Sequence, residues 1–210
     1  MPNKEDHIQK IIRSTNNFYE LDMLKNIARH TENDAAIIDI GANIGNHSIY
    51  FGMFCKASKV ISFEPQPFVF DVFSENIKLN NLDNKIFAFQ LGIGSEQGYA
   101  NLQDVDPKNL GMTKLSYKPK GNVEIANLDD FLNKNFEIDN VSVLKIDVEG
   151  MEIDVLKGAV KTILKYKPFI YAEAGDQESY MKLNEFLSSV GYIKTERFNA
   201  TATYLFTPVK

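Results

Sequence analysis

The feature that most constrains this chain is the stretch from Ile37 to Asn46, which reads Ile-Ile-Asp-Ile-Gly-Ala-Asn-Ile-Gly-Asn. Its first isoleucines are β-branched and leave no polar face, which is typical of a buried central strand of a parallel sheet. Gly41 permits a sharp turn and a close approach of the backbone to a ligand, and Gly45 allows close packing where a helix begins. Apolar side chains at helical spacing follow. The stretch therefore predicts a strand, a tight turn and a helix whose first N–H groups face whatever lies over the turn.

Two classes of cofactor compete for a turn of this kind. Dinucleotide enzymes use Gly-x-Gly-x-x-Gly, whose glycines admit a pyrophosphate. Here Asp39 precedes Gly41, and Ala42 and Asn43 follow it before the next glycine. An aspartate at the strand tip repels a pyrophosphate but can engage the cationic amino end of S-adenosylmethionine (SAM). The pattern is similar to motif I of Rossmann-like methyltransferases, and the alternative is an ordinary structural strand–helix turn.

A second strand pattern, Lys59 to Phe63, ends in Glu64 and Pro65. Glu64 comes roughly 20 residues after the glycine turn, where a Rossmann unit places the carboxylate that binds ribose hydroxyls. A carboxylate suits a vicinal diol because it accepts two hydrogen bonds at once. We therefore expect Glu64, with Pro65 beside it, to hold a cofactor ribose, and the alternative is a solvated residue that ends a strand.

Composition excludes several classes of function. The 210 residues, 44% hydrophobic and 24% charged, fit a single α/β domain of ordinary composition. A net charge of −5 and a pI of about 5.3 argue against nucleic-acid binding. The one cysteine, Cys55, excludes an internal disulfide and favours a reducing compartment, so we expect a cytoplasmic protein. No apolar run is long enough to span a membrane, and the charged N-terminus does not read as a secretory signal.

Two helices are predicted within residues 1–35. One covers residues near 5–13, and the other carries an apolar stripe from Phe18 to Ile27, with Asn17 and Glu20 as an N-cap pair. This N-terminal helical segment either covers the cofactor or pads the sheet. Residues 36–210 are predicted to form the SAM-binding domain, with no linker between the two parts.

The middle of the chain supplies a third strand and an irregular segment. The strand over residues 85–91 leads into a glycine-rich turn, which in a doubly wound sheet lies beside the first two strand tips. We therefore expect Leu91 and Gly92 to border an adenine. Residues 104–122 are broken by prolines and glycines, which indicates either a binding loop or a flexible insertion. A short strand at 123–125 follows, and then a helix with Asn127 as its N-cap.

Three acidic residues follow strand patterns in the last third of the chain. The apolar run at 141–146 ends in Asp147 and Glu149, and the run at 168–172 ends in Glu173. All three should lie at the carboxyl edge of the sheet, where α/β folds bind ligands. Carboxylates held close together raise one another's pKa towards that of a useful base. A helix at 178–190 and a hairpin, residues 192–197 with 202–207, complete the pattern.

The carboxylates also have alternative interpretations. Their oxygens could bind Mg²⁺, although the sequence assigns no metal ligand. Glu149 is equally typical of an acid favoured by a helix dipole. His47 can act as a base or simply begin its helix. Lys145, in the middle of a strand, should pair with a carboxylate if it is buried.

Together these blocks resemble the FkbM family of SAM-dependent methyltransferases. The resemblance lies in four pieces of the chain and covers roughly residues 36–173. These pieces are Ile38-Asp39-Ile40-Gly41-Ala42-Asn43-Ile44-Gly45, Phe63-Glu64-Pro65, Leu128-Asp129-Asp130-Phe131-Leu132 and Leu144-Lys145-Ile146-Asp147-Val148-Glu149-Gly150-Met151-Glu152. The last two are the more specific, and residues 104–122 have no counterpart.

The resemblance implies an α/β, Rossmann-like class I methyltransferase fold, with a seven-stranded, mostly parallel sheet and a C-terminal antiparallel hairpin. It implies SAM as cofactor and O-methylation, often of sugars or natural products. Gly41, Ala42, Asn43, Gly45 and Asn46 would surround the methionine end of SAM, and Asp147 would lie near its amine or methyl group.

Asp147, Glu149 and Glu173 are then the candidate catalytic bases, because a sugar hydroxyl must lose its proton. The acceptor is expected to be a small molecule or glycan, and the pattern leaves a homo-oligomer open. The alternatives are an N-methyltransferase, which needs no carboxylate base, a SAM-binding protein without catalysis, and a dinucleotide oxidoreductase.

Overall fold

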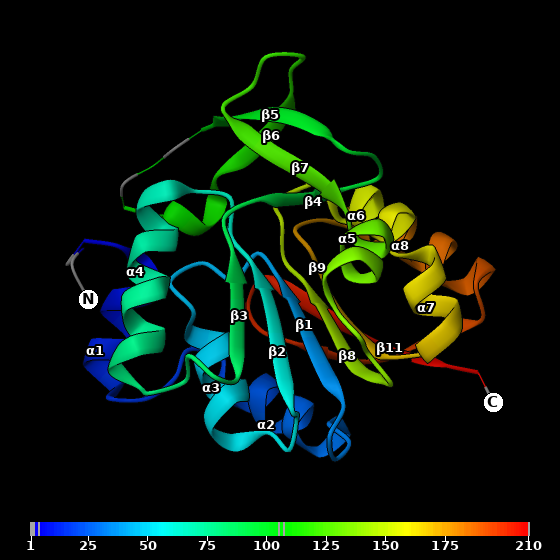
Figure 1. The fold of residues 1–210 in the computed structure, drawn as a ribbon, viewed down its shortest axis with the longest axis horizontal. Coiled ribbons are helices and arrows are strands. Elements are labelled where there is room, and N and C mark those ends of the chain that lie inside the picture. The colour runs from blue at the N-terminus through cyan, green and yellow to red at the C-terminus, as the bar shows by residue number, and fades with distance from the viewer. Residues whose placement is uncertain (1–2, 4, 105, 107, 210) are drawn as a thin grey trace.

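The computed structural model describes residues 3, 5–104, 106 and 108–209. Its centre is a sheet of seven strands, namely β1 (Ala36–Ile40), β2 (Lys59–Phe63), β3 (Ile86–Phe89), β8 (Val141–Ile146), β9 (Phe169–Ala174), β10 (Tyr192–Phe198) and β11 (Ala202–Pro208). Their order is β10-β11-β9-β8-β1-β2-β3 (Figure 1). Only β11 runs antiparallel to its neighbours β9 and β10. This order confirms the predicted Rossmann-like sheet with an antiparallel C-terminal hairpin.

Helices cover both faces of this sheet. One face carries α2 (Leu21–His30), α3 (Asn46–Phe54) and α4 (Pro67–Leu79), and the other carries α5 (Leu128–Asn135), α6 (Glu152–Gly158), α7 (Val160–Tyr166) and α8 (Gln177–Ser189). Consecutive strand residues point to opposite faces, so Ile37 packs in the first core and Ile38 in the second. The two-sided apolar pattern of β1 is thus explained by helices on both sides.

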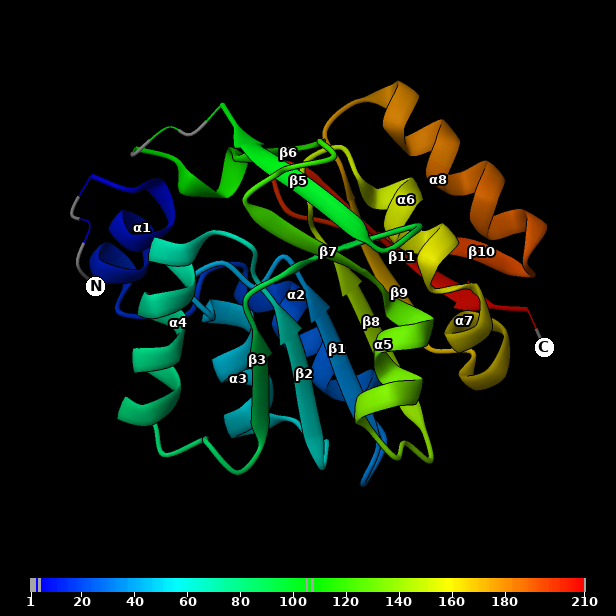
Figure 2. The ribbon, with the colours of Figure 1, turned by 45° about the horizontal axis from the view of Figure 1, so that its top comes forward.

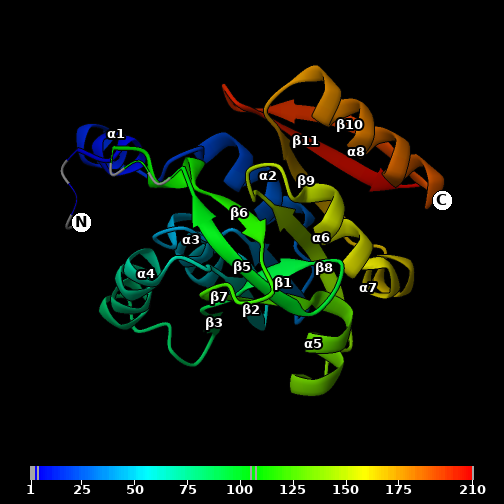
Figure 3. The same ribbon diagram turned by 90° about the horizontal axis from the view of Figure 1, so that it is seen from above.

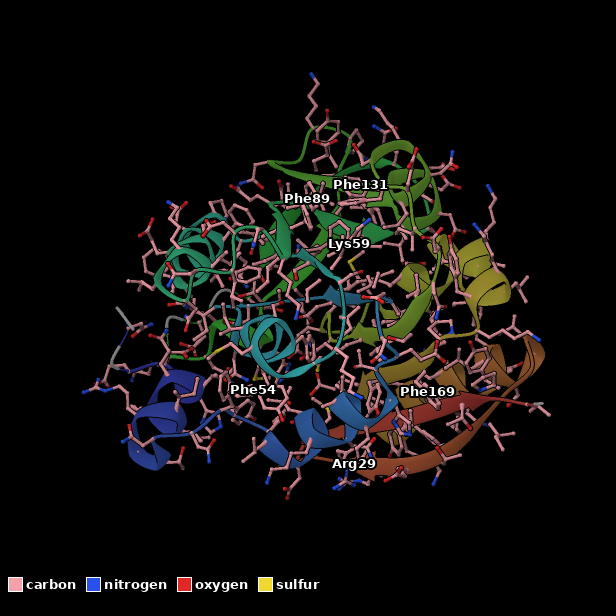
Figure 4. All side chains as sticks on the ribbon, turned by 60° about the horizontal axis from the view of Figure 1, so that its bottom comes forward. Arg29, Phe54, Lys59, Phe89, Phe131 and Phe169 are labelled. Atoms are coloured by element: carbon pink, nitrogen blue, oxygen red, sulfur yellow. The ribbon has the colours of Figure 1, made fainter. Side chains whose placement is uncertain are left out.

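An aromatic cluster joins α5 to the edge of the sheet. Phe131 of α5 packs edge-on against Phe89 of β3, with ring centroids 4.9 Å apart, and against Phe63 of β2 at 5.2 Å. Phe89 and Phe131 lie next to each other in Figure 4. Such edge-on contacts add to area burial, and here they fix α5 beside the tips of β2 and β3.

A second, four-stranded sheet lies across the carboxyl ends of the parallel strands (Figures 1 and 3). It consists of β4 (Gly92–Gly94), β5 (Gly98–Gln103), β6 (Lys114–Tyr117) and β7 (Val123–Asn127), in the order β4-β7-β5-β6. The expectation of an irregular segment at 104–122 is therefore wrong in part. Residues 110–112 form a 3₁₀ turn, and β6 pairs with β5. A strand of four residues is too short for its alternation to be recognised without that partner.

The two N-terminal helices take different positions. Helix α2 belongs to the main core through Met23, Leu24 and Ile27, whereas α1 (His7–Thr15) lies beside residues 108–110 near the carboxyl edge (Figure 2). The predicted N-cap pair is wrong, because the Asn17 side chain accepts from the next residue and Glu20 itself is the N-cap of α2. The segment therefore both pads the sheet and covers its carboxyl edge.

Two smaller features complete the fold. The segment after Gly150 forms two short helices, α6 and α7, separated at Ala159. Cys55 is buried at the end of α3, as expected of a packing residue. In the part of the chain that the structure describes, no helix combines the length and apolar character that a bilayer crossing requires.

Candidate functional site

A cavity of about 400 Å³ opens at the carboxyl edge of the central strands, within the size range of small-molecule sites. We divide its wall by strand order. The β2–β3 side consists of Glu64, Pro65, Leu91 and Gly92, and the β8–β9 side consists of Asp147, Glu149 and Glu173, with Glu20 and His47 facing them from the N-terminal segment and α3. The turn after β1, from Gly41 to Asn43, lies between the two sides. Residues of α1 and of 109–115 complete the wall.

The turn after β1 requires its two glycines for different reasons. Gly41 has φ +80°, and a Cβ there would lie 1.7 Å from the carbonyl oxygen of Asp147. Gly45 has φ +85°, and a Cβ there would meet the ring of Phe73 at 2.1 Å. Gly41 lines the cavity with Ala42 and Asn43, but Gly45 does not. The contact with Phe73 shows that Gly45 lets α3 begin against α4, and its cofactor contact stays a prediction.

Glu64 lies at the bottom of the β2–β3 side, 3% exposed. Its two carboxylate oxygens accept the backbone N–H groups of Asn43 and Gln66, each at 2.9 Å. Burial raises the pKa of Glu64 to about 7, against the opposing effect of these two donors. Each oxygen keeps a further lone pair for a ligand. Pro65, Leu91 and Gly92 line the same side, so the structure brings these predicted residues together.

Asp39 lies elsewhere than expected. Its side chain is fully buried beneath the turn and is absent from the cavity wall. It accepts a hydrogen bond from Ser48 and lies 3.1 Å from Nζ of Lys145. Because these partners occupy it, the assignment of Asp39 as a direct cofactor contact is corrected to that of a buried counter-ion.

Lys145 links this counter-ion to the site. Its ammonium lies 3.4 Å from the carboxylate of Asp147 and donates to the carbonyl of Gly41 at 2.9 Å. Burial lowers the pKa of Lys145, but the carboxylates of Asp39 and Asp147 outweigh that effect and raise it. The prediction that a buried Lys145 pairs with a carboxylate is confirmed, and the pairing fixes the turn against the tip of β8.

Asp147, Glu149 and Glu173 form a compact carboxylate trio. One oxygen from each lies within 4.8 Å of the others. Burial favours protonation of Asp147, but the Lys145 ammonium and a hydrogen bond from Glu173 hold its pKa below the usual value. Burial and the charge of Asp147 raise the pKa of Glu173 to about 10. Burial and the same charge raise the pKa of Glu149 to about 7.

These shifts separate the roles open to the trio. At neutral pH Asp147 is ionised, Glu173 carries a proton, and Glu149 titrates, which is the condition for a general base. Glu149 also has φ +49°, a backbone conformation that is uncommon for glutamate and is often found at functional sites. Three carboxylate oxygens are equally the donor type that Mg²⁺ prefers.

Asn46 has a different task from the one expected. It lines the cavity, but its side-chain amide accepts from the backbone N–H of Tyr19 and donates to the carbonyl of Tyr19, both at 3.1 Å. It therefore holds the N-terminal segment against the start of α3. One residue later, Nε2 of His47 lies 3.2 Å from a carboxylate oxygen of Glu20.

Sequence reasoning missed Tyr19 and Glu20 as cavity residues. Burial, and then the charges of Glu20, Asp147 and Glu173, raise the pKa of Tyr19 to about 12. Its hydroxyl therefore stays protonated and can donate towards these acids. No local pattern marks either residue, because their partners Asn46 and His47 lie 27 positions further along the chain.

The chain is 31% identical over 147 residues to "Methyltransferase 1" of Beauveria bassiana, 27% over 145 residues to hexuronic acid methyltransferase AglP of Haloferax volcanii, and 28% over 165 residues to 2-O-methyltransferase NoeI of Sinorhizobium fredii. These alignments cover 60, 69 and 70% of the chain, in the same order, and 58, 58 and 66% of the relatives. The chain therefore spans less than two thirds of the length of these curated relatives.

A solved structure of an FkbM methyltransferase from Methylobacillus flagellatus has the same fold. It superposes with a TM-score of 0.62 at 20% identity, over 83% of this chain and 43% of that one. The methyltransferase FkbM domain matches residues 39–194, which is more than half of the chain. Those residues run from the tip of β1 to the start of β10 and include the glycine turn, Glu64 and the carboxylate trio. The chain therefore belongs to the FkbM family of SAM-dependent methyltransferases.

Proposed function

We propose that this protein transfers the methyl group of SAM to a hydroxyl of a small acceptor, a sugar or a glycan intermediate. The observation that carries the proposal is the carboxylate trio, which faces the cavity beside the glycine turn and holds a titrating glutamate. The name of one relative, a hexuronic acid methyltransferase, supports a sugar acceptor, and that of another, a 2-O-methyltransferase, supports transfer to oxygen. The lone buried Cys55 is consistent with a cytoplasmic enzyme.

The cavity fits SAM on three points. At Gly41 no room exists for a side chain, so the turn offers bare backbone to a ligand. Glu64 keeps lone pairs for the two ribose hydroxyls after accepting its two backbone donors. Leu91 and Gly92 supply an apolar wall beside it for the adenine. These residues would hold the nucleoside of SAM on the β2–β3 side, and the trio would then face the end of the cofactor that supplies the methyl group.

The protein's own contribution is to position the acceptor and take its proton. Bound SAM supplies the methyl group and its own leaving group. Glu149 accepts the proton of the acceptor's hydroxyl. A positioned base typically accelerates such a reaction by ~100- to 10,000-fold. Asp147, fixed and kept ionised by Lys145, accepts a hydrogen bond from the acceptor. Protonated Glu173 donates a hydrogen bond to the Asp147 carboxylate and so fixes the carboxylate that faces the acceptor.

Two measurements test this proposal. Calorimetric titration with SAM and S-adenosylhomocysteine should show binding to the wild-type protein that is lost in Glu64→Ala. Labelled SAM offered with uronic acids, neutral sugars and amino sugars should then place the label on oxygen. Label on nitrogen, at a rate that Glu149→Gln does not change, would show an N-methyltransferase, because an amine needs no carboxylate base.

A further inference from the structure

An acid–imidazole pair remains on the β8–β9 side that the proposed reaction does not use. It consists of Glu20, which precedes α2, and His47, which begins α3, with Nε2 and Oε2 3.2 Å apart. Their side chains are only 14 and 9% exposed, and both line the cavity. In the part of the chain that the structure describes, Nε2 of His47 is buried without a hydrogen bond and no residue bonds to Nδ1, so the ring has a nitrogen available to a ligand.

The pair is held in place at some cost to the chain. Taking a carboxylate and an imidazole out of water is unfavourable unless something else compensates, and such pairs are weak stabilisers of a fold. Glu20 also has φ +60°, a strained conformation for a glutamate. The Asn46 amide fixes the neighbouring Tyr19 backbone from both sides. The backbone conformation of Glu20 and the Asn46–Tyr19 contact thus place this acid–imidazole pair in the cavity wall.

The proposed cofactor has an end that needs such a pair. The methionine end of SAM carries an ammonium and a carboxylate, and Asp39, the acid first expected to meet the ammonium, is buried under the turn. The neighbouring trio is acidic and offers nothing to a carboxylate. Of the other basic side chains in the cavity wall, Lys145 is occupied by Asp39 and Asp147, and His7 packs edge-on against Tyr19.

We propose that Glu20 and His47 together bind the amino-acid end of SAM, with Glu20 taking the ammonium and His47 the carboxylate. This inference rests on the proposed function, because it presumes that SAM occupies the cavity. It makes the N-terminal segment part of the cofactor site, although that segment lies outside residues 39–194, which the family domain matches. A ring nitrogen that carries a hydrogen donates to a carboxylate oxygen, so His47 offers the ligand's carboxylate a donor that the acidic trio lacks.

Three ligands separate the two contacts. SAM has both charged groups, decarboxylated SAM keeps only the amine, and 5′-methylthioadenosine has neither. Calorimetry with each ligand should show that Glu20→Gln lowers the affinity for SAM and for decarboxylated SAM by about 10- to 100-fold, which is the loss typical of a hydrogen bond to a charged group. His47→Asn should lower the affinity for SAM alone by a similar factor. Both variants should bind 5′-methylthioadenosine as the wild type does.

The controls distinguish this role from a purely structural one. Glu75→Gln removes an exposed glutamate that pairs with Lys78 on α4, and it should bind all three ligands normally. Glu20→Asp keeps the charge on a shorter side chain and should recover part of the lost affinity. Circular dichroism and a thermal melt establish that each variant is folded.

The possible failures are separable. If the variants lose affinity for 5′-methylthioadenosine by the same factor as for SAM, the pair only fastens the N-terminal segment and the inference is wrong. The inference is equally wrong if neither variant changes the affinity for SAM. If the wild-type protein binds none of the three ligands, the proposed function fails first, and the inference fails with it.

Discussion

The two sides of the cavity are built in different ways. On the β2–β3 side, Glu64 is held by backbone N–H groups from Asn43 and from Gln66, two residues further along the chain. On the β8–β9 side, carboxylates from separate strands contact one another and Lys145 through their side chains. Backbone donors fix a geometry that tolerates sequence change, whereas side-chain charges depend on every partner. We therefore expect the β8–β9 side to be the more fragile of the two and the one that sets the chemistry.

Lys145→Met breaks the side-chain network at its centre. It leaves Asp39 and Asp147 without their cation, and removing one partner of a buried ion pair typically costs about 3–5 kcal/mol. Urea denaturation should show a loss of that size. The double variant Asp39→Asn with Lys145→Met should recover part of it, because the fully buried charge is then also removed. Equal stability of wild type and Lys145→Met would show that the network is not what holds this side together.

Glu149→Gln tests the chemistry of the same side without disturbing its packing. Loss of the base should lower the methyl-transfer rate by about 100-fold or more, with SAM affinity unchanged. In the wild type the ionised form is the active one, so activity should fall as the pH drops through the Glu149 pKa of about 7 and be constant above it. A flat profile between pH 5 and 9, tested at saturating SAM, would assign the base elsewhere.

Gly41→Ala tests the backbone turn that the two sides share. Its new Cβ would lie 1.7 Å from the Asp147 carbonyl oxygen, so the tip of β8 must move. Gly150→Ala is a matched control, because Gly150 also has positive φ, +96°, but open space around it. The control should lose about 1 kcal/mol from backbone strain alone. Gly41→Ala should lose more than that and should no longer bind SAM, as measured by denaturation and calorimetry.

The sequence predicted the backbone-built parts of the molecule well. The strand β1, the glycine turn and the place of Glu64 at the end of β2 are all marked by short local patterns, such as the isoleucines of β1 and the acid that follows β2, whereas the seven-stranded sheet is implied by the family resemblance. The helix start at Asn127 is equally local, since its side-chain oxygen accepts a hydrogen bond from the backbone N–H of Asp130, three residues further along. Each of these features depends on residues that are close together in the chain.

The errors fall where partners are distant in the chain. Asp39 is buried because Lys145, more than a hundred residues away, neutralises it. Asn46 faces Tyr19 rather than only the cavity, and β6 exists because β5 pairs with it. Periodicity and motif spacing carry no information on such pairs, which form only when the whole sheet is assembled.

Charge balance on the β8–β9 side also bears on whether the trio is a metal site. The trio has the oxygen donors that Mg²⁺ prefers. However, the Lys145 ammonium already lies 3.4 Å from Asp147, and Glu173, with a pKa of about 10, is protonated at neutral pH. A cation would have to displace both, so we expect treatment with EDTA to leave the methyl-transfer rate within about twofold, a difference of ~0.4 kcal/mol in barrier. The assay needs only the wild-type enzyme, its acceptor and labelled SAM.

The opposite result would change the assignment of the trio. If EDTA abolishes transfer and Mg²⁺ restores it, the three carboxylates are ionised around a cation, and Glu173→Gln should then raise the Mg²⁺ concentration needed for activity. If the rate is unaffected, Glu173→Gln should be tolerated better than Glu173→Ala. An amide at position 173 can still donate to Asp147 as the protonated acid does, whereas alanine removes that donor and leaves Asp147 held by Lys145 alone.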